Sequence, residues 1–367
     1  MNQKIRAIGA AVLVVIWAAL TGFAWFGPAK DISEAERRPL EQWPGISVET
    51  LLNGKFMTKF EDYTLDQFPG RDTFRQIKSL FHYYAMQQLD NNDIYIVDGY
   101  AAKLEYPMNQ SSVNYAVRKF NNLYEKYLKE SDGNIYFAIV PDKGYYLAEE
   151  NGYPAMDYDA LFAQMEEKLS WAEFIDITDC LDAEDYYYTD AHWRQENIIP
   201  VAQKIAQAMG NTVPQEADYN KVLIERPFYG VYYGQAALPM QPEEMYILTN
   251  DMLSDCKVYS EELGAYTDVY NMDKLTSKDL YDVYLSGPQM LLTIENPNAT
   301  TDKELIIFRD SFGSSISPLL IQDYSKITLV DIRYIASDFL GEYVTFNGQD
   351  VLFLYNTLVL NSASTLK

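Results

Sequence analysis

The chain has 367 residues, 48% of them apolar, and a formal net charge of −24 at pH 7. The apolar fraction is enough for a sizeable core and excludes a generally disordered chain. The strong negative charge argues against nucleic acid as a partner, because phosphates need cationic partners, and disfavours contact of the folded part with anionic lipid head groups.

The N-terminus carries an apolar run from Ala7 to Phe26, about the length that crosses a bilayer. Lys4 and Arg6 precede it, so the positive-inside rule leaves the short N-terminus in the cytoplasm and the rest of the chain outside. A cleaved signal peptide is the main alternative and has the same orientation. The run is longer than a typical signal core and has no clear small-residue cleavage site, which favours an uncleaved anchor over residues 1–27.

Residues 28–91 are predicted to be a linker followed by helices. The segment from Pro28 to Pro44 is polar and punctuated by proline, as expected of a linker. Apolar residues at spacings of three and four then predict two helices separated by Pro69 and Gly70, with stripes formed by Phe56, Phe60 and Tyr63 and by Phe74, Ile77, Phe81 and Tyr84. His82 lies on the second helix, and we interpret it as a packed or surface residue.

Residues 92–367 are predicted to form an α/β domain with a mainly parallel sheet. Short apolar runs predict strands, and amphipathic stretches between them predict helices. The run at 135–140 is apolar throughout, which suits a strand in a sheet covered on both faces. Residues from about 211 to 284 fit this rhythm poorly and are rich in tyrosine, so we predict an insertion or lid there.

Candidate catalytic residues lie in two segments. Asp190 and His192 are two residues apart, and this spacing points both side chains the same way in an extended or turning backbone. Such a pair lacks only a nucleophile to form an acyl-transfer triad. Ser311 follows the apolar strand at 305–308, where N–H groups at the start of the next helix can hold an oxyanion. Helix capping by Asp310 and Ser311 is the simpler alternative.

The chain has two cysteines and two histidines. Cys180 and Cys256 could pair in an oxidising compartment or remain buried free thiols. No Cys/His cluster has zinc-site spacing, so we expect no metal and no other cofactor. A metal site built from carboxylates alone is the alternative that the sequence leaves open.

The stretch Thr189-Asp190-Ala191-His192-Trp193 resembles the Asp-His-His-Trp signature of the bacterial DHHW family. It also resembles the Thr-Asp-x-His-Trp motif of the alginate O-acetyltransferase group in the SGNH-hydrolase-like superfamily. Segments 34–40, 66–72, 92–100 and 309–312 support the resemblance in the same order along the chain. The Asp-x-His step precedes the serine, as in a circularly permuted SGNH fold. Two positions depart from the patterns: Ala191 replaces the middle histidine, and Arg309 replaces the glycine of Gly-Asp-Ser.

The resemblance implies an SGNH-like three-layer α/β sandwich and a Ser-His-Asp triad of Ser311, His192 and Asp190. It also implies transfer of acetyl to a hydroxyl of a surface polysaccharide, with a multispan membrane acyltransferase as donor. An esterase would use the same acyl-serine. The alternative is a catalytically inactive sugar-binding or scaffold module, which the Ala191 and Arg309 departures favour.

Six further residues are candidates for substrate binding. Lys143 lies in a loop that resembles the strand-Pro-x-Lys loop of the acetyltransferase group, with a solvated loop lysine as the alternative. Arg333 and Asn356 each follow a predicted strand, and Trp193 completes the resembling motif. Tyr232 and Tyr233 belong to the tyrosine-rich segment, where aromatic rings suit sugar faces.

Overall fold

The computed structural model describes residues 3–33 and 35–367. These residues form two compact units, one comprising Met1–Asn92 with Tyr233–Pro239 and the other Asp93–Tyr232 with Met240–Lys367. Helix α9 (Val231–Ala236) contains residues of both.

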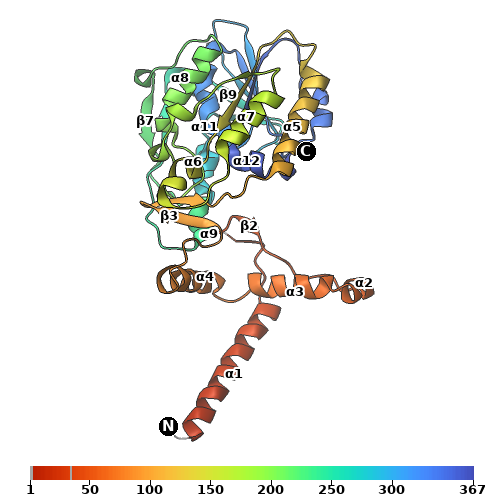
Figure 1. Ribbon diagram of the computed structural model, residues 1–367, viewed down its shortest axis with the longest axis vertical. Coiled ribbons are helices and arrows are strands. Elements are labelled where there is room, and N and C mark those ends of the chain that lie inside the picture. Colours follow the sequence, from red (N-terminus) through yellow and green to blue (C-terminus); the bar gives the residue numbers. More distant parts are fainter. Residues whose placement is uncertain (1–2, 34) are drawn as a thin grey trace. The chain divides into compact units, whose positions relative to one another are not determined.

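The larger unit is built on an eight-stranded sheet of order β10-β9-β11-β13-β12-β14-β5-β6 (Figure 1). Strands β13, β12, β14, β5 and β6 run parallel, whereas β11, β9 and β10 extend one edge by antiparallel pairing. The strands are β5 (Ile135–Val140), β6 (Glu173–Phe174), β9 (Lys257–Ser260), β10 (Ala265–Asp268), β11 (Leu291–Glu295), β12 (Glu304–Arg309), β13 (Lys326–Val330) and β14 (Asp350–Asn356). The fold is therefore mixed α/β with a mainly parallel sheet, as the sequence predicts.

Helices cover both faces of this sheet and make the three layers. Along β12, Leu305 and Ile307 face one apolar cluster, and Ile306 and Phe308 face the other, because side chains alternate along a strand. The first cluster contains residues of α8 (Ile199–Ala208), α11 (Gly313–Ile316) and the following 3-10 helix Ser317–Asp323. The second contains residues of α5 (Gln110–Leu123), α7 (Tyr158–Lys168) and α12 (Thr357–Asn361). Burial on both sides explains why the central strands are apolar throughout.

The tyrosine-rich segment 211–284, which we expected to be an insertion or lid, is partly built into the sheet. Its strands β9 and β10 join the main sheet, where Val258 of β9 pairs with Ile294 of β11. Strands β7 (Asn220–Leu223) and β8 (Tyr246–Thr249) form a separate antiparallel pair, followed by the short helix α10 (Asp251–Asp255). Strands of four residues rich in polar and aromatic side chains leave too short a pattern to be recognised in the sequence.

Two smaller elements of the larger unit follow local signals. The hairpin of β3 (Ile94–Val97) and β4 (Tyr100–Lys103) turns at Asp98 and Gly99, which both have positive φ. Helix α6 (Lys143–Leu147) follows β5 directly and is capped by the side chain of Asp142.

The N-terminal unit contains α1 (Gln3–Phe26), the strands β1 (Ile32–Ser33) and β2 (Arg38–Pro39), and the helices α2 (Val48–Leu52), α3 (Lys55–Asp66) and α4 (Arg71–Leu80). A π-helical turn, Phe81–Ala85, continues α4. Helix α1 is long and apolar enough to cross a membrane, although a signal sequence has the same features.

Candidate active site

Ser311 lies in a tight turn between β12 and α11, at the carboxyl edge of the sheet. Asp310 shapes this turn, because its Oδ1 accepts the Phe312 N–H at 2.9 Å and its Oδ2 accepts the Asn356 N–H at 2.6 Å. Burial raises the pKa of Asp310 above its ordinary value. Asn356 ends β14, so the bond ties the serine turn to the neighbouring strand and orders it before any ligand binds.

Asp190 and His192 lie in a bent loop closed by the pairing of Tyr186 with Trp193. The Tyr187 N–H donates to the His192 carbonyl at 3.0 Å and narrows the loop. Asp190 Oδ1 accepts the backbone N–H of His192 at 3.1 Å, so the carboxylate folds back over its own turn. The expected common direction of the two side chains therefore arises from a turn and not from a strand.

The three predicted catalytic side chains meet at this edge. His192 Nε2 lies 2.7 Å from Ser311 Oγ, and His192 Nδ1 lies 2.6 Å from Asp190 Oδ1. Asp190 is fully buried, and the His192 side chain is 13% exposed. The imidazole thus bridges a buried carboxylate and a partly exposed serine hydroxyl, the arrangement that acyl transfer through a serine requires.

A second segment holds Asp190 from behind. Its Oδ2 accepts the Val231 N–H at 2.8 Å, and the Gly230 N–H donates to Thr189 Oγ1 at 2.8 Å. A Cβ on Gly230 would lie 2.3 Å from both the Asp190 Cβ and the Thr189 carbonyl oxygen. Only glycine permits this approach, which explains the glycine among the tyrosines of this segment.

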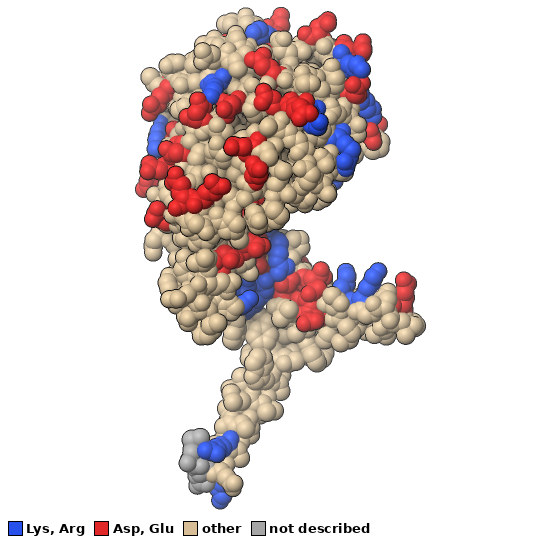
Figure 2. Space-filling view, in the orientation of Figure 1, with Lys and Arg blue, Asp and Glu red and all other residues tan. Residues whose placement is uncertain are grey.

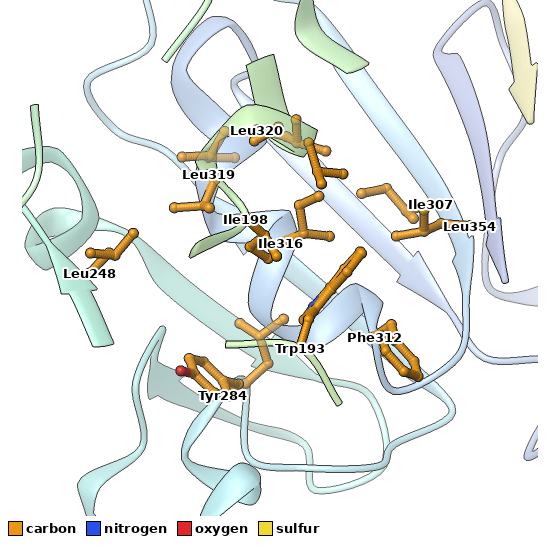
Figure 3. Packing of buried hydrophobic residues seen from close by; sticks show 14 of the residues in the cluster. Trp193, Ile198, Leu248, Tyr284, Ile307, Phe312, Ile316, Leu319, Leu320 and Leu354 are labelled. Carbon is orange, nitrogen blue, oxygen red and sulfur yellow. The ribbon is translucent and has the colours of Figure 1, made fainter. Parts of the chain in front are cut away.

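Aromatic rings fix the plane of the imidazole. The Tyr281 ring stacks on His192 with centroids 3.9 Å apart and planes 13° apart, and Phe312 lies 4.8 Å away at a tilt. Ser315 joins these groups, because its Oγ lies 2.7 Å from the Tyr281 hydroxyl and accepts the Trp193 Nε1–H at 2.8 Å. Figure 3 shows Trp193 and Phe312 side by side in the cluster of buried hydrophobic residues.

Glu243 clamps the first part of the loop. Its two carboxylate oxygens accept the N–H groups of Tyr188 and Thr189, each at 2.8 Å, and Oε2 also lies 2.6 Å from Arg194 Nη2. The carboxylate is nearly buried, so these charge-assisted bonds are shielded from solvent. The loop that presents Asp190 and His192 is therefore held by partners on both sides.

Arg309, one of the two departures from the family patterns, lies completely buried beneath the serine turn. Its Nη1 donates to Ser314 Oγ at 3.1 Å and to the Asp310 carbonyl at 3.3 Å, and lies 3.9 Å from Asp331. Gly313 lets the turn pass over it, since a Cβ there would lie 2.7 Å from the Arg309 Cβ. Burial lowers the pKa of Arg309. The arginine therefore supports the turn from within and is not exposed to solvent.

Four of the six residues considered for substrate binding are buried and have internal partners. Lys143 is neither a solvated lysine nor a surface contact: its Nζ donates to the Tyr187 carbonyl at 2.8 Å, and the Tyr232 ring covers it at 5.2 Å. Trp193 is fully buried and bound to Ser315. Asn356 caps α12 and donates to the Val140 carbonyl at 3.0 Å. Tyr232 is buried as well, so none of the four presents its side chain at the surface, and a substrate-binding role for them stays a prediction.

The other two are less buried. Arg333 forms a two-pronged ion pair with Asp331, at 2.9 and 2.6 Å, and keeps 18% of its side chain exposed. Bonding to Asp331 outweighs the opposing effect of burial, so the pKa of Arg333 is raised. Tyr233 is half-buried and belongs to the N-terminal unit. A binding role for either residue stays a prediction.

The supporting residues Gly230, Val231, Glu243 and Tyr281 were missed in the sequence. Only Gly230, a glycine within a run of aromatic residues, could have indicated this segment. A backbone N–H that donates to a carboxylate can belong to any residue type except proline, so the sequence does not reveal it. His82 also belongs to the N-terminal unit, where its Nδ1 lies 2.9 Å from Gln88 Oε1.

Cys180 and Cys256 are free thiols in the structure. Burial raises the pKa of each to about 11, so neither is an activated nucleophile at neutral pH. Within residues 3–33 and 35–367, no group of three or more His, Cys, Asp or Glu side chains could hold a metal ion.

The fold and the order of the site segments define a mixed α/β protein with a mainly parallel sheet and an Asp-x-His step that precedes the serine along the chain. No protein-family model matches the chain, and no curated protein matches it. The chain is similar to the crystal structure of a DHHW family protein from Eubacterium siraeum, with a TM-score of 0.60 and 24% identity over 74% of this chain and 93% of that one. It is also similar to Bacillus cereus PatB1 with a sulfonyl adduct, with a TM-score of 0.58 and 20% identity over 73% and 95% of the two chains. At these identities the likeness establishes a shared fold.

Proposed function

We propose that the chain is a membrane-anchored, extracytoplasmic serine acyltransferase or esterase that acts on O-acyl esters of a polysaccharide. The observation that carries the proposal is the hydrogen-bonded line from Ser311 Oγ through His192 to Asp190, with distances of 2.7 and 2.6 Å. A serine hydroxyl is a poor nucleophile near neutral pH, and an adjacent base held in one orientation supplies its activation.

The first half-reaction forms an acyl-serine. Ser311 Oγ attacks the carbonyl carbon of the donor ester while His192 Nε2 takes the hydroxyl proton. The tetrahedral intermediate collapses, the C–O bond to the donor breaks, and the imidazolium returns the proton to the leaving oxygen. Asp190 holds Nδ1–H and stabilises the imidazolium, which fixes the tautomer that leaves Nε2 free to accept.

The second half-reaction reverses the roles. A sugar hydroxyl gives its proton to His192 and attacks the acyl carbon, and Ser311 leaves and is reprotonated. Water in place of the sugar gives hydrolysis through the same intermediate. The Ser311 N–H donates to no other group among residues 3–33 and 35–367, which supports it as a donor to the oxyanion.

The substrate assignment rests on the resemblance of Thr189–Trp193 to the motif of the alginate O-acetyltransferase group. It points to acetyl as the acyl group, a polysaccharide hydroxyl as acceptor and a multispan membrane acyltransferase as donor. Helix α1, with Lys4 and Arg6 before its apolar run, supports single-pass anchoring with the catalytic unit outside the cytoplasm. Protease added to intact cells, after any wall is opened, should then digest the chain beyond Pro28; protection of that part would overturn the topology.

The mechanism is tested by mass spectrometry of the full chain after reaction with an activated acetyl ester or a sulfonyl fluoride. The second probe is suggested by the sulfonyl adduct in the PatB1 structure. One covalent adduct on Ser311 is expected in the wild type and in Ser254→Ala, an exposed-serine control, and none in Ser311→Ala. Adducts that persist in Ser311→Ala would reject the mechanism and favour the non-catalytic sugar-binding alternative.

A further inference from the structure

Helix α4 of the N-terminal unit exposes its apolar face. Phe74, Ile77, Phe81 and Tyr84, the last two in the π-helical turn, follow one another at intervals of three and four and form one stripe. Their exposed fractions are 52%, 57%, 56% and 66%. The sequence predicted this stripe, but its exposure was not expected.

The polar face of α4 is the side that contacts protein. Arg71 and Arg75 both form ion pairs with Glu36, and Arg75 Nη2 donates to the Gly234 carbonyl at 3.1 Å. One turn further on, Ser79 is buried and its Oγ accepts from Asn91 Nδ2 at 2.7 Å. These bonds fix the rotation of the helix, so the apolar stripe cannot turn inward without breaking them.

This arrangement is the reverse of a helix on a water-soluble domain, which buries its apolar stripe and solvates its polar face. A contiguous exposed apolar surface marks an interaction site. Other helices of the same unit also expose apolar residues: Val48 and Leu52 of α2 are 74% and 85% exposed, and Met57 of α3 is 61% exposed.

The apolar stripe is continuous with α1 through aromatic contacts. The Phe74 ring lies 5.5 Å from Phe68, which lies 6.3 Å from Trp17 on α1. Nearer the C-terminal end of α1, the ring centroid of Trp25 lies 5.4 Å from that of Phe60 of α3. Figure 2 shows α1 without charged side chains above its N-terminal end. Trp25 lies at the C-terminal end of the apolar run Ala7–Phe26, which suits the boundary between hydrocarbon and water, where tryptophan concentrates.

From these contacts we infer that α4 lies in the plane of the membrane surface, with the stripe Phe74–Tyr84 inserted among the lipids beside α1. The inference rests on the proposed anchoring of α1, because the same apolar surface continues from one helix to the other. The occupant is a bilayer held by burial of apolar area. Attraction to anionic head groups is not required, in keeping with the net charge of −24.

The test uses the full chain in phosphatidylcholine nanodiscs, with one environment-sensitive fluorophore on an introduced cysteine and a spin label on the lipid chains. Phe81→Cys reports the stripe, and Phe339→Cys is the matched control, a phenylalanine of the larger unit that is equally exposed at 56%. Val14→Cys reports α1. Cys180 and Cys256 are replaced by alanine, and acylation of Ser311 is measured on every sample.

Several-fold quenching at Phe81→Cys, with none at Phe339→Cys, is the expected result. If the lipid spin label does not quench the fluorophore at Phe81→Cys, the inference is overturned. This holds both when iodide, a quencher dissolved in the water, reaches the fluorophore and when a second copy of the chain or another protein shields it. Val14→Cys then shows whether anchoring by α1 failed as well, and Ser311 acylation shows independently whether the catalytic proposal stands. Ile77→Glu should reduce quenching at Phe81→Cys without changing acylation.

Discussion

The backbone N–H of Val231 lies 2.8 Å from Oδ2 of Asp190, on the oxygen that His192 does not use. This bond joins the tyrosine-rich segment to the loop that presents the imidazole. The carboxylate therefore has both oxygens occupied before substrate binds, and its orientation depends on residues 230–232.

Gly230→Ala should lower turnover of a small acetyl ester by about 100-fold, the cost of a misplacement of about 1 Å in a catalytic group. The added Cβ would lie 2.3 Å from the Asp190 Cβ, so the carboxylate must shift. Gly45→Ala is the control, because nothing lies within 4 Å of its Cβ. Steady-state kinetics together with thermal unfolding separates a loss of turnover from a loss of stability. Wild-type turnover in a folded Gly230→Ala protein would contradict the role of this segment.

Ser311→Ala and His192→Ala should each reduce acyl transfer by several orders of magnitude, about 10⁶-fold in the best-studied triad, and the double variant should be scarcely worse than either alone. The reason is that the two side chains, 2.7 Å apart, act as one unit. The measurement is release of the leaving group from an activated ester. Additive losses would show independent roles, and His82→Ala should leave the rate unchanged.

Tyr281→Phe should change turnover little, whereas Tyr281→Leu should reduce it by about 10- to 100-fold through misplacement of the imidazole. Phenylalanine keeps the ring stacked 3.9 Å from His192 and loses only the bond to Ser315, which Trp193 still contacts. The loss of that one hydrogen bond should cost about 1 kcal/mol of unfolding free energy. Equal losses of activity in the two variants would assign the effect to the hydroxyl.

Tyr232→Ala should impair turnover of a small acetyl ester as well as of a polymer. Tyr232 is buried, its N–H donates to the Thr189 carbonyl at 3.0 Å, and its ring covers the Lys143 ammonium. Removing the ring opens a cavity of the kind that costs about 3–5 kcal/mol and loosens the loop that carries Asp190. Kinetics on both substrates provides the measurement; loss on the polymer alone would support the substrate-binding role expected from the sequence.

The free energy of unfolding of the wild type, relative to Lys143→Met, should rise with pH between about 7 and 10.5. Burial lowers the pKa of Lys143 from 10.5 to about 7 in the folded chain. In that window the unfolded chain binds more protons than the folded one, so raising the pH favours folding, by up to about 1.4 kcal/mol per pH unit. Below pH 7 the difference should be flat. Denaturant unfolding across this range is the measurement, and a flat difference throughout would mean that Lys143 keeps its ordinary pKa.

The sequence by itself determined features that depend on neighbours along the chain. Apolar runs such as 135–140 and 305–308 predict buried parallel strands, because a strand covered on both faces has no polar side. The two-residue step from Asp190 to His192 places their side chains together in any turning backbone. Ser311, at the end of a strand, lies at the edge where α/β sheets carry their sites.

Only the tertiary structure decided what depends on distant segments. It brings Ser311 to His192 across 119 residues and Val231 to Asp190 across 41. It also buries Lys143, Trp193 and Tyr232, whose residue types suit a surface equally well, and leaves the stripe of α4 exposed. Amphipathic spacing says that a helix has two unlike faces; which face meets protein is decided by the partners, here Glu36 and Asn91, that bind the polar one.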